Sequence, residues 1–272
     1  MKRLAIYGGG RMGEALIGGL LASGWGPPSD LAVVEVSPVR REQLYAALDA
    51  DHRGLSVGED PVPAEGAVIA VKPSDVEAAC RAMVPQAYRR VLSVAAGVSL
   101  ASLEKWLGAL SAPRPPAVVR AMPNTAALVG AGAAAVAAGT GASDDDVTWA
   151  EEILGSVGTV VRVAEGQLDA VTGLSGSGPA YVFLLAEALV DAGVLVGLPR
   201  PVARSLAVQT LLGAARLLDE TGETPEALRA AVTSPGGTTA AGLRALESRA
   251  VRAAVLEAVV AASERSRQLG GG

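Results

Sequence analysis

Short apolar runs alternate with longer amphipathic stretches from Lys2 to about Val163. The runs predict strands, and the stretches between them have the apolar spacing of three to four residues that is typical of helices. Such an alternation indicates an α/β fold, a parallel sheet covered by helices. The predicted strands are Leu4–Tyr7, Leu31–Val36, Ala67–Val71, Val91–Val94, Val118–Ala121, Ala131–Ala137 and Thr159–Val163. The predicted helices are Glu14–Ser23, Val39–Leu48, Ser74–Met83, Leu100–Leu107 and Asp144–Leu154.

Beyond Val163 the strand signal disappears, and apolar residues recur at helical spacing, as in Leu211, Ala215 and Leu218. These small, Ala-rich helices have wide apolar faces that a segment of this length can hardly bury alone. We therefore expect two domains: an α/β domain over residues 1–163 and an all-α dimerisation domain over residues 164–272.

The longest apolar stretch runs from Ala180 to Leu198 and contains Glu187 and Asp191. Both charges would be costly in the middle of a bilayer, so we interpret the stretch as a buried helix of a soluble protein. The N-terminal residues run at once into glycines and lack the apolar centre of a signal peptide. The single cysteine, Cys80, allows no disulfide within one chain. We expect a cytoplasmic protein.

Charge narrows the range of partners. Lys and Arg number 23 and Asp and Glu number 28, for a net charge of −5 and a pI near 5.1. This balance argues against a nucleic-acid coat or a polybasic membrane surface. The expected partners are a small-molecule substrate and further copies of the chain, in a homodimer or a higher homo-oligomer.

A glycine-rich motif follows the first predicted strand directly. Gly8-Gly9-Gly10-Arg11-Met12-Gly13 fits G-x-G-x-x-G and leads straight into a helix. Gly8 permits a tight turn, Gly10 lets the backbone approach a pyrophosphate, and Gly13 lets helix and strand pack closely. Free amides at the helix start would hold the anion, so the motif predicts a Rossmann dinucleotide site.

The end of the second predicted strand bears on which dinucleotide is used. Glu35 stands where an acidic residue binds the adenine ribose hydroxyls, which favours NADH. Ser37, Arg40 and Arg41 follow closely, and a hydroxyl with an arginine could accommodate the 2′-phosphate of NADPH. Both cofactors remain open at this point.

Two further strand ends carry candidate residues, because ligands of open parallel sheets bind outside the carboxyl ends of the strands. Lys72, followed by Pro73, ends one of these strands and is one of only three lysines. After the next strand, the small residues Ala95, Ala96 and Gly97 would let a nicotinamide lie close to the backbone.

Several other chemistries are not supported. His52, the only histidine, lies in a predicted polar turn, which argues against a histidine proton relay and against a serine hydrolase. Cys80 has the spacing of a small core residue. Asp144, Asp145 and Asp146 follow Ser143 and suit a helix start better than a metal. We expect no metal site.

The chain resembles the pyrroline-5-carboxylate reductase family, on five segments that span nearly its whole length. They are Gly8–Gly13 with Glu14-Ala15-Leu16, Ala70–Pro73, Arg120–Thr125, Asp169–Tyr181 and Thr233–Thr239. The chain departs from the family at Ala126, where proline is usual, at Glu59-Asp60, where asparagine is common, and at Glu35, where NADP-preferring members have a short polar residue.

The resemblance implies reduction of 1-pyrroline-5-carboxylate to L-proline by NADPH or NADH, the last step of proline synthesis. It implies that the turn into the helix Ala240–Leu246 holds the substrate carboxylate, and that Thr239 lies against the ring nitrogen as the catalytic residue. The implied substrate-binding residues are Ser234, Gly236, Gly237, Thr238 and Thr239. The cofactor-binding residues are Tyr7, Gly8, Gly9, Gly10, Arg11, Met12, Gly13, Glu35, Ser37, Ala70, Val71, Lys72, Pro73, Ala95, Ala96, Gly97 and Asn124.

Two alternatives stay open. A β-hydroxyacid dehydrogenase has a similar layout but uses a lysine in its helical domain, and no lysine follows Lys105 here. A catalytically silent NAD(P)-binding regulatory protein is the other possibility, against which the intact Gly236-Gly237-Thr238-Thr239 segment speaks.

Overall fold

The computed structural model describes residues 1–49, 54–108 and 115–270, so His52 lies outside the described residues. The contacts divide the chain into two compact units. The first unit comprises Met1–Ser177 together with Ala261–Gly272, and the second comprises Gly178–Val260. The last strand ends at Arg162. A domain boundary between residues 163 and 164 stays a prediction based on secondary structure.

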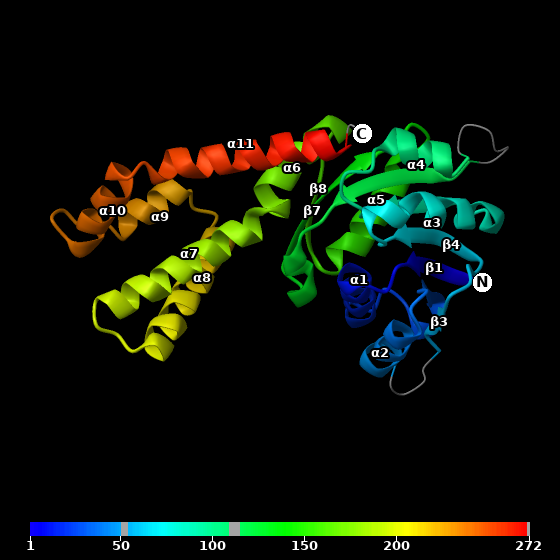
Figure 1. The fold of residues 1–272 in the computed structure, drawn as a ribbon, viewed down its shortest axis with the longest axis horizontal. Helices are drawn as coiled ribbons and strands as arrows, with labels where there is room; N and C mark the ends of the chain where they lie inside the picture. The colour runs from blue at the N-terminus through cyan, green and yellow to red at the C-terminus, as the bar shows by residue number, and fades with distance from the viewer. Residues whose placement is uncertain (50–53, 109–114, 271–272) are drawn as a thin grey trace. The chain divides into compact units, whose positions relative to one another are not determined.

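The first unit is built on an eight-stranded sheet of order β3-β2-β1-β4-β5-β6-β7-β8 (Figure 1). The first six strands of this order, 3-2-1-4-5-6, have the order of the dinucleotide-binding Rossmann fold, which confirms the predicted α/β class. The strands are β1 (Lys2–Tyr7), β2 (Leu31–Val34), β3 (Ser56–Gly58), β4 (Ala64–Ile69), β5 (Arg90–Ser93), β6 (Ala117–Met122), β7 (Gly132–Ala138) and β8 (Gly158–Arg162).

Helices cover both faces of this sheet. The α-helices of the first unit are α1 (Arg11–Ala22), α2 (Pro38–Leu48), α3 (Val76–Met83), α4 (Leu100–Trp106), α5 (Asp144–Gly155) and α6 (Leu168–Val171). Shorter turns are η1 (Pro28–Asp30), η2 (Pro73–Asp75), η3 (Val84–Gln86), η4 (Thr125–Val129), η5 (Glu165–Gln167) and the π-helical η6 (Thr172–Gly176).

Side chains alternate between the two faces of the central strand β1, as the pleat requires. Leu4 and Ile6 pack into a core with α1, α2 and α5, whereas Ala5 and Tyr7 pack into a second core with α3 and α4. Cys80 is fully buried in the second core, as its helical spacing predicted. Burial, together with the Glu77 carboxylate, raises the pKa of the Cys80 thiol to about 12.

Two features of the sheet differ from the sequence-based prediction. Strand β7 runs antiparallel to β6 and parallel to β8, so the sheet is mixed rather than wholly parallel. Only η4 connects β6 to β7, and a parallel crossover needs a dozen or more residues. The short edge strand β3 pairs with β2 and was not predicted, because three residues are too few for a periodic signal.

The second unit is helical throughout, as predicted. It contains α7 (Gly178–Leu195), α8 (Arg200–Thr221), α9 (Pro225–Ala231), α10 (Thr238–Ser248) and the first part of α11 (Val251–Gly270). Pro199 precedes α8, and the Thr224 hydroxyl accepts from the Ala227 amide at the start of α9. These are the helix starts that the proline positions indicated.

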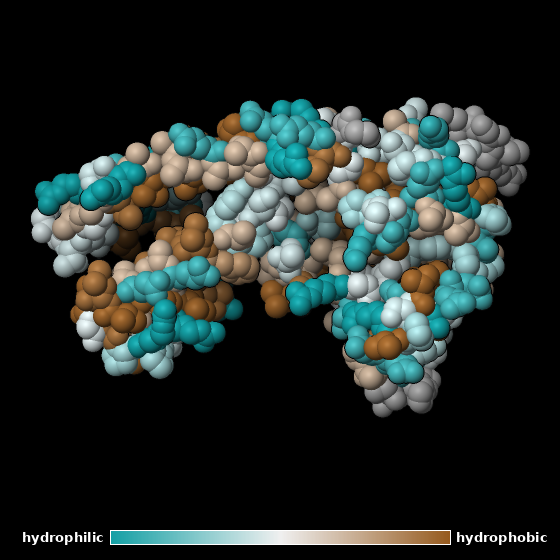
Figure 2. Space-filling view, viewed as in Figure 1, coloured by the Kyte–Doolittle hydropathy of each residue, from teal (hydrophilic) through white to brown (hydrophobic). Residues whose placement is uncertain are grey.

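Apolar side chains stay exposed on α7 and α8, and Figure 2 shows them gathered along both helices beside a polar stripe. Phe183 is 63% exposed, Leu184 68% and Leu206 55%. No residue of α7 is buried within the single chain, so the prediction of a buried helix was wrong for the isolated chain. Helices α7 and α8 pack against each other, and their outer apolar faces stay exposed in the single chain.

By length and composition, one helical stretch among the described residues would pass for a membrane span. It is Glu165–Leu195, with a mean hydropathy of 1.5 and none of its most apolar window buried. This stretch includes α7 and therefore carries much of the exposed apolar surface described above.

Candidate active site

The glycine-rich loop after β1 adopts the geometry that a dinucleotide requires. Gly8 has φ +99°, a region that side chains disfavour, and a Cβ there would lie 2.7 Å from the Ala70 carbonyl oxygen. A Cβ at Gly13 would lie 2.1 Å from the Gly8 carbonyl oxygen. The loop is thus packed against the β4 segment on one side and against its own helix on the other.

Helix α1 starts directly from this loop with open donors. Gly10 is the N-cap of α1, and no side chain caps the helix start. A Cβ built on Gly10 would meet nothing within 4 Å, so the space above this residue is open. Uncapped amides at a helix start with open space in front fit a pyrophosphate. The residues present therefore fit a dinucleotide.

Glu35 lies at the carboxyl end of β2 beside the glycine loop, where the sequence placed it. Its Oε2 accepts from the Gly9 amide at 2.9 Å and its Oε1 accepts from the Ser37 amide at 2.8 Å. Each carboxylate oxygen has two lone pairs, so Glu35 can accept further hydrogen bonds without moving. A contact of Glu35 with the adenine ribose stays a prediction.

The two arginines after Ser37 are already engaged. Arg40 Nε donates to the Gly9 carbonyl at 2.6 Å, and its guanidinium forms a short ion pair with Glu14 of α1. Arg41 donates to the Glu35 carbonyl at 2.8 Å and pairs with Glu59 at 3.2 Å. Both cations therefore brace the glycine loop and the end of β2, and each has a carboxylate partner.

The loops after β4 and β5 lie on neighbouring strands of the sheet. The Ala70 amide donates to the Tyr7 carbonyl at 2.7 Å, which continues the β1–β4 pairing into the loop. Lys72 precedes η2 with an exposed side chain, and Gly97 turns the chain with φ +75°. Both segments lie just beyond the carboxyl ends of neighbouring strands, where ligands of open α/β sheets bind. A contact of either segment with the nicotinamide stays a prediction.

A cavity of about 420 Å³ opens at these two loops, within the first unit. Sequence reasoning found only three of its lining residues, Pro73, Ala96 and Gly97. The others are Thr172, Ser177, Ala262, Arg265, Ser266 and Leu269. A series of glycines and serines runs through η6 and could have pointed to Thr172 and Ser177. In the structure η6 is a π-helical turn, a feature that occurs frequently at functional sites. Nothing local marked the last four.

Asn124 has a structural role in addition to its predicted one. Its Oδ1 accepts from the Ala126 amide at 3.2 Å and from the Ala133 amide at 3.1 Å, while its Nδ2 donates to the Ser175 carbonyl at 3.0 Å. The side chain thereby ties the β6–β7 connection to η6. A cofactor contact of Asn124 stays a prediction.

The predicted substrate turn belongs to the second unit and precedes α10. The Gly237 amide donates to the Ser234 carbonyl at 3.1 Å, and Gly236 has φ +70°. Gly237 is the N-cap of α10 without a capping side chain, so the helix begins at Thr238, two residues earlier than predicted. Thr238 and Thr239 therefore present amides and hydroxyls at an uncapped helix start.

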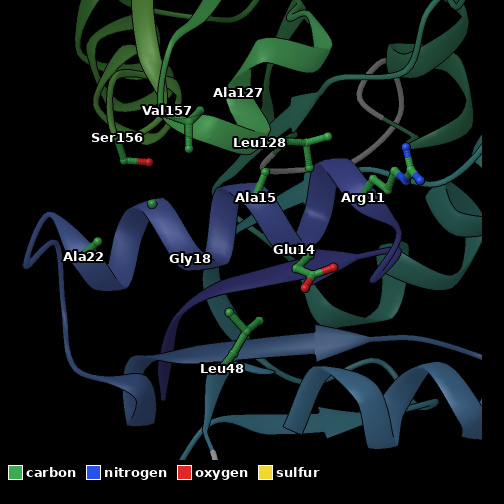
Figure 3. A pocket seen from close by; sticks show the side chains of 12 residues that line it. Arg11, Glu14, Ala15, Gly18, Ala22, Leu48, Ala127, Leu128, Ser156 and Val157 are labelled. Carbon is green, nitrogen blue, oxygen red and sulfur yellow. The ribbon is translucent and has the colours of Figure 1, made fainter. Parts of the chain in front are cut away.

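A separate cavity of about 530 Å³ follows α1 (Figure 3). Arg11 and Glu14 line its end near the glycine loop, and Ala15, Gly18 and Ala22 continue along the helix. The cavity runs along the side of α1, and none of the residues that line it comes from the loops after β4 and β5.

The acidic triplet starts α5 as predicted. Asp146 accepts from the Ser143 amide at 2.9 Å and from its hydroxyl at 2.6 Å, which closes a capping box. Asp146 also pairs with Arg90 at 2.8 Å. Burial raises the pKa of the Asp146 carboxyl, but the bonds from Ser143 and the charge of Arg90 outweigh it and hold the pKa below its usual value.

Comparison with known proteins gives two profile matches. Residues 165–269 match the pyrroline-5-carboxylate reductase dimerisation domain, and residues 3–97 match a family described as coenzyme F420-dependent NADP oxidoreductase. A dinucleotide loop on a Rossmann sheet, joined to a helical dimerisation domain, defines an NAD(P)-dependent oxidoreductase that self-associates.

Full-length relatives specify the family. Pyrroline-5-carboxylate reductases of Mycobacterium tuberculosis and Arabidopsis thaliana are 46% and 41% identical to this chain, over 99% and 98% of it and 97% and 95% of their own lengths. The solved enzyme of Coxiella burnetii superimposes with a TM-score of 0.90 at 36% identity, covering 98% of both chains. That of Plasmodium falciparum, with NADP bound, gives 0.81 at 28% identity, over 99% of this chain and 98% of its own. The chain belongs to the pyrroline-5-carboxylate reductase family.

Proposed function

We propose that this chain reduces 1-pyrroline-5-carboxylate to L-proline with NADPH or NADH. The supporting observation is the combination of two sites in one chain: an open dinucleotide loop after β1 and an uncapped Ser-Pro-Gly-Gly-Thr-Thr turn before α10. A cyclic imine needs a hydride donor, a site for its carboxylate and one weak proton donor. It needs neither a metal nor a nucleophile.

The first unit binds and orients the dinucleotide. Gly8 to Gly13, with Arg11 and Met12 among them, hold the pyrophosphate by the amides of the α1 start, while Glu35 and Ser37 face the adenosine. The loops Ala70–Pro73 and Ala95–Gly97 shape the nicotinamide side together with Asn124. Tyr7 contributes through its backbone, because its side chain is buried in the second core and bonds to the Tyr88 hydroxyl. When bound, the reduced nicotinamide supplies the hydride.

The second unit carries the residues that recognise the substrate. Ser234, Gly236, Gly237 and Thr238 bind the carboxylate through hydroxyls and helix-start amides. The Thr239 hydroxyl lies against the ring nitrogen and donates or orients the proton that the nascent amine retains, with water resupplying it. Because a threonine hydroxyl is a poor acid near neutral pH, its contribution is below the roughly 100- to 10,000-fold of a matched general acid.

We further propose a homodimer formed through the exposed apolar faces of α7 and α8, where Phe183 and Leu184 would be covered. Two helices that expose this much apolar surface need a partner surface. We also place the enzyme in the cytoplasm, where the lone thiol of Cys80 stays reduced.

Substitutions at Thr239 test the chemical assignment. Thr239→Ser keeps the hydroxyl and should retain much of kcat, whereas Thr239→Val keeps the shape and should lose as much as Thr239→Ala. The loss should fall on kcat, with the Kd of NADH unchanged. Wild-type kcat in the valine variant would show that Thr239 only packs in the turn.

The competing functions are separated by turnover. A β-hydroxyacid dehydrogenase would oxidise hydroxy acids with NAD(P)⁺ and leave the imine untouched. A silent dinucleotide-binding protein would bind NADH without consuming it in the presence of the imine. Assays of folded wild-type protein with the imine and with hydroxy acids therefore distinguish all three.

A further inference from the structure

A cluster of charged side chains surrounds the glycine loop and the carboxyl ends of β2 and β3, within the first unit. Its members are Glu14, Glu35, Arg40, Arg41 and Glu59. The Glu35 amide donates to the Gly58 carbonyl at 2.7 Å, so Glu59, the residue after β3, follows directly beside the end of β2. Three carboxylates stand against two guanidiniums, and the cluster therefore has a net negative charge.

Arg40 has no donor group to spare in this cluster. Its Nε donates to the Gly9 carbonyl at 2.6 Å, and its Nη1 donates to Gln43 Oε1 at 3.2 Å. Its Nη2 forms the short ion pair with Glu14. Each nitrogen of the guanidinium thus has a partner, and a ligand would have to displace one of them.

Arg41 is held differently, because all of its contacts run through Nη1. This nitrogen donates to the Glu35 carbonyl at 2.8 Å and to the Val36 carbonyl at 3.1 Å. It also lies 3.2 Å from Glu59 Oε2, the one carboxylate that pairs with Arg41 in the described part of the chain. Nε and Nη2 make no hydrogen bond to any described residue, so the guanidinium is fixed in place with donors still available to a ligand.

The Glu59 side chain can be changed without releasing Arg41 from its position. The Arg41 side chain is 23% exposed and bonds to two backbone carbonyls, whereas the Glu59 side chain is 63% exposed. Among the described residues, Arg41 is the only partner of the Glu59 carboxylate. The main effect of Glu59 is therefore on the charge of Arg41 and not on its placement.

We propose that Glu59 is a specificity-determining residue that disfavours NADPH by neutralising Arg41, an inference that rests on the proposed function and extends it to the choice of dinucleotide. In a Rossmann fold the adenine ribose lies beyond the end of the second strand, where an arginine can bind a 2′-phosphate. Arg41 is fixed at this strand end by the Glu35 and Val36 carbonyls. While Glu59 is paired with it, Arg41 offers a 2′-phosphate little net charge. The uncharged ribose hydroxyl of NADH is indifferent to this pairing.

The test measures the Kd of NADH and of NADPH by calorimetry, without imine, in wild type and in Glu59→Gln. The substitution keeps the size of the side chain and removes its charge. The Kd of NADPH should fall about 3- to 10-fold, less than a buried charge-assisted hydrogen bond would give, because solvent screens exposed groups. The Kd of NADH should change less than about twofold. An unchanged ratio of the two Kd values would overturn the proposal.

Removal of Arg41 shows whether the gain runs through this arginine. In the Arg41→Gln background, Glu59→Gln should change the ratio of the two Kd values less than about twofold, because no guanidinium is left to release. The ratio cancels any general weakening of dinucleotide binding that the loss of Arg41 causes. A gain of the same size in this background would reduce the role of Glu59 to simple repulsion and overturn the proposal.

Glu151→Gln is the matched control. Glu151 also pairs with an arginine of the first unit, Arg162, at 2.7 Å. Arg162 ends β8, which lies at the opposite edge of the sheet from β3. The substitution thus removes the same charge and releases an arginine elsewhere, and the ratio of the two Kd values should equal that of the wild type. A shift as large as that of Glu59→Gln would reduce the result to net charge and overturn the proposal.

This outcome is separable from that of the proposed function, because the binding measurements contain no imine. Dinucleotides that bind with an unmoved ratio would overturn the role of Glu59 and leave the reductase assignment intact. A dinucleotide that binds but is not oxidised when the imine is added would refute the proposed function, whatever the ratio in Glu59→Gln.

Discussion

Replacing Glu35 should change which dinucleotide the enzyme prefers. The Glu35 carboxylate accepts hydrogen bonds from the Gly9 and Ser37 amides just beyond the end of β2. The adenine ribose would lie at this end of the strand. Glu35→Ser removes the charge and frees both amides as donors, which suits a 2′-phosphate. Glu35→Gln removes the charge alone and separates the two contributions.

The magnitude follows from Coulomb's law. Two unit charges repel by about 4 kcal/mol at 4 Å and by about half that at twice the distance, at an effective dielectric of about 20. Arg40 and Arg41 offset part of this, although both already have carboxylate partners in Glu14 and Glu59. We expect a net gain of about 1.4 to 2.8 kcal/mol for NADPH relative to NADH, a 10- to 100-fold rise in the ratio of their kcat/KM values.

The assay measures kcat/KM for NADH and for NADPH at saturating imine in wild type, Glu35→Ser and Glu35→Gln. Glu42→Gln, an exposed acidic residue of α2, is the control and should leave the ratio unchanged. Raising the salt concentration should shrink the effect, since exposed charges are screened. A ratio unmoved in both Glu35 variants would refute the reasoning and place Glu35 away from the ribose.

Three further predictions follow from other contacts. Gly13→Ala should weaken NADH binding at least tenfold by calorimetry, because its Cβ would press on the Gly8 carbonyl, whereas Gly18→Ala, whose nearest contact is 3.8 Å, should bind normally. Asp146→Asn should lower the free energy of unfolding by about 1.5 to 3 kcal/mol at pH 7. Because the folded-state pKa of Asp146 is depressed, this difference should vanish in denaturation curves as the pH falls through that pKa. Sedimentation should show a dimer, and Phe183→Glu should shift it toward monomer; an unshifted dimer would place the interface elsewhere.

The Rossmann half of the fold was predictable because its signals are local. Apolar runs predict the strands, and the glycine motif Gly8–Gly13 predicts the turn that follows the first of them. This turn needs the positive φ of Gly8 and the close approach that Gly13 allows. The orientation of β7 was not predictable from periodicity, which is the same in parallel and antiparallel strands. The exposure of α7 agrees with the expectation that the helical segment cannot bury its apolar faces alone. The interpretation of Ala180–Leu198 as a buried helix was wrong for the isolated chain, because apolar composition does not tell whether a helix packs within its own chain or against a second copy.

The candidate site was only partly predictable for a related reason. Gly, Ser and Thr segments next to strand ends and helix starts have recognisable patterns, and the structure shows Gly10 and Gly237 as the N-caps of α1 and α10. Arg265 and Ser266 reach the β4 and β5 loops through tertiary packing alone, by the bond from Ser266 to Asp169, 97 residues earlier in the chain. The hydrophobic periodicity of the sequence carries no information about a contact between residues so far apart in the chain.

Isotope transfer tests the central claim most directly. The purified enzyme is given 1-pyrroline-5-carboxylate with NADH or NADPH that carries deuterium at the transferable position of the nicotinamide. The account predicts L-proline with one deuterium on the carbon that was the imine carbon, formed in equal amount to the oxidised dinucleotide. Dinucleotide binding without L-proline, or L-proline without deuterium, would contradict it.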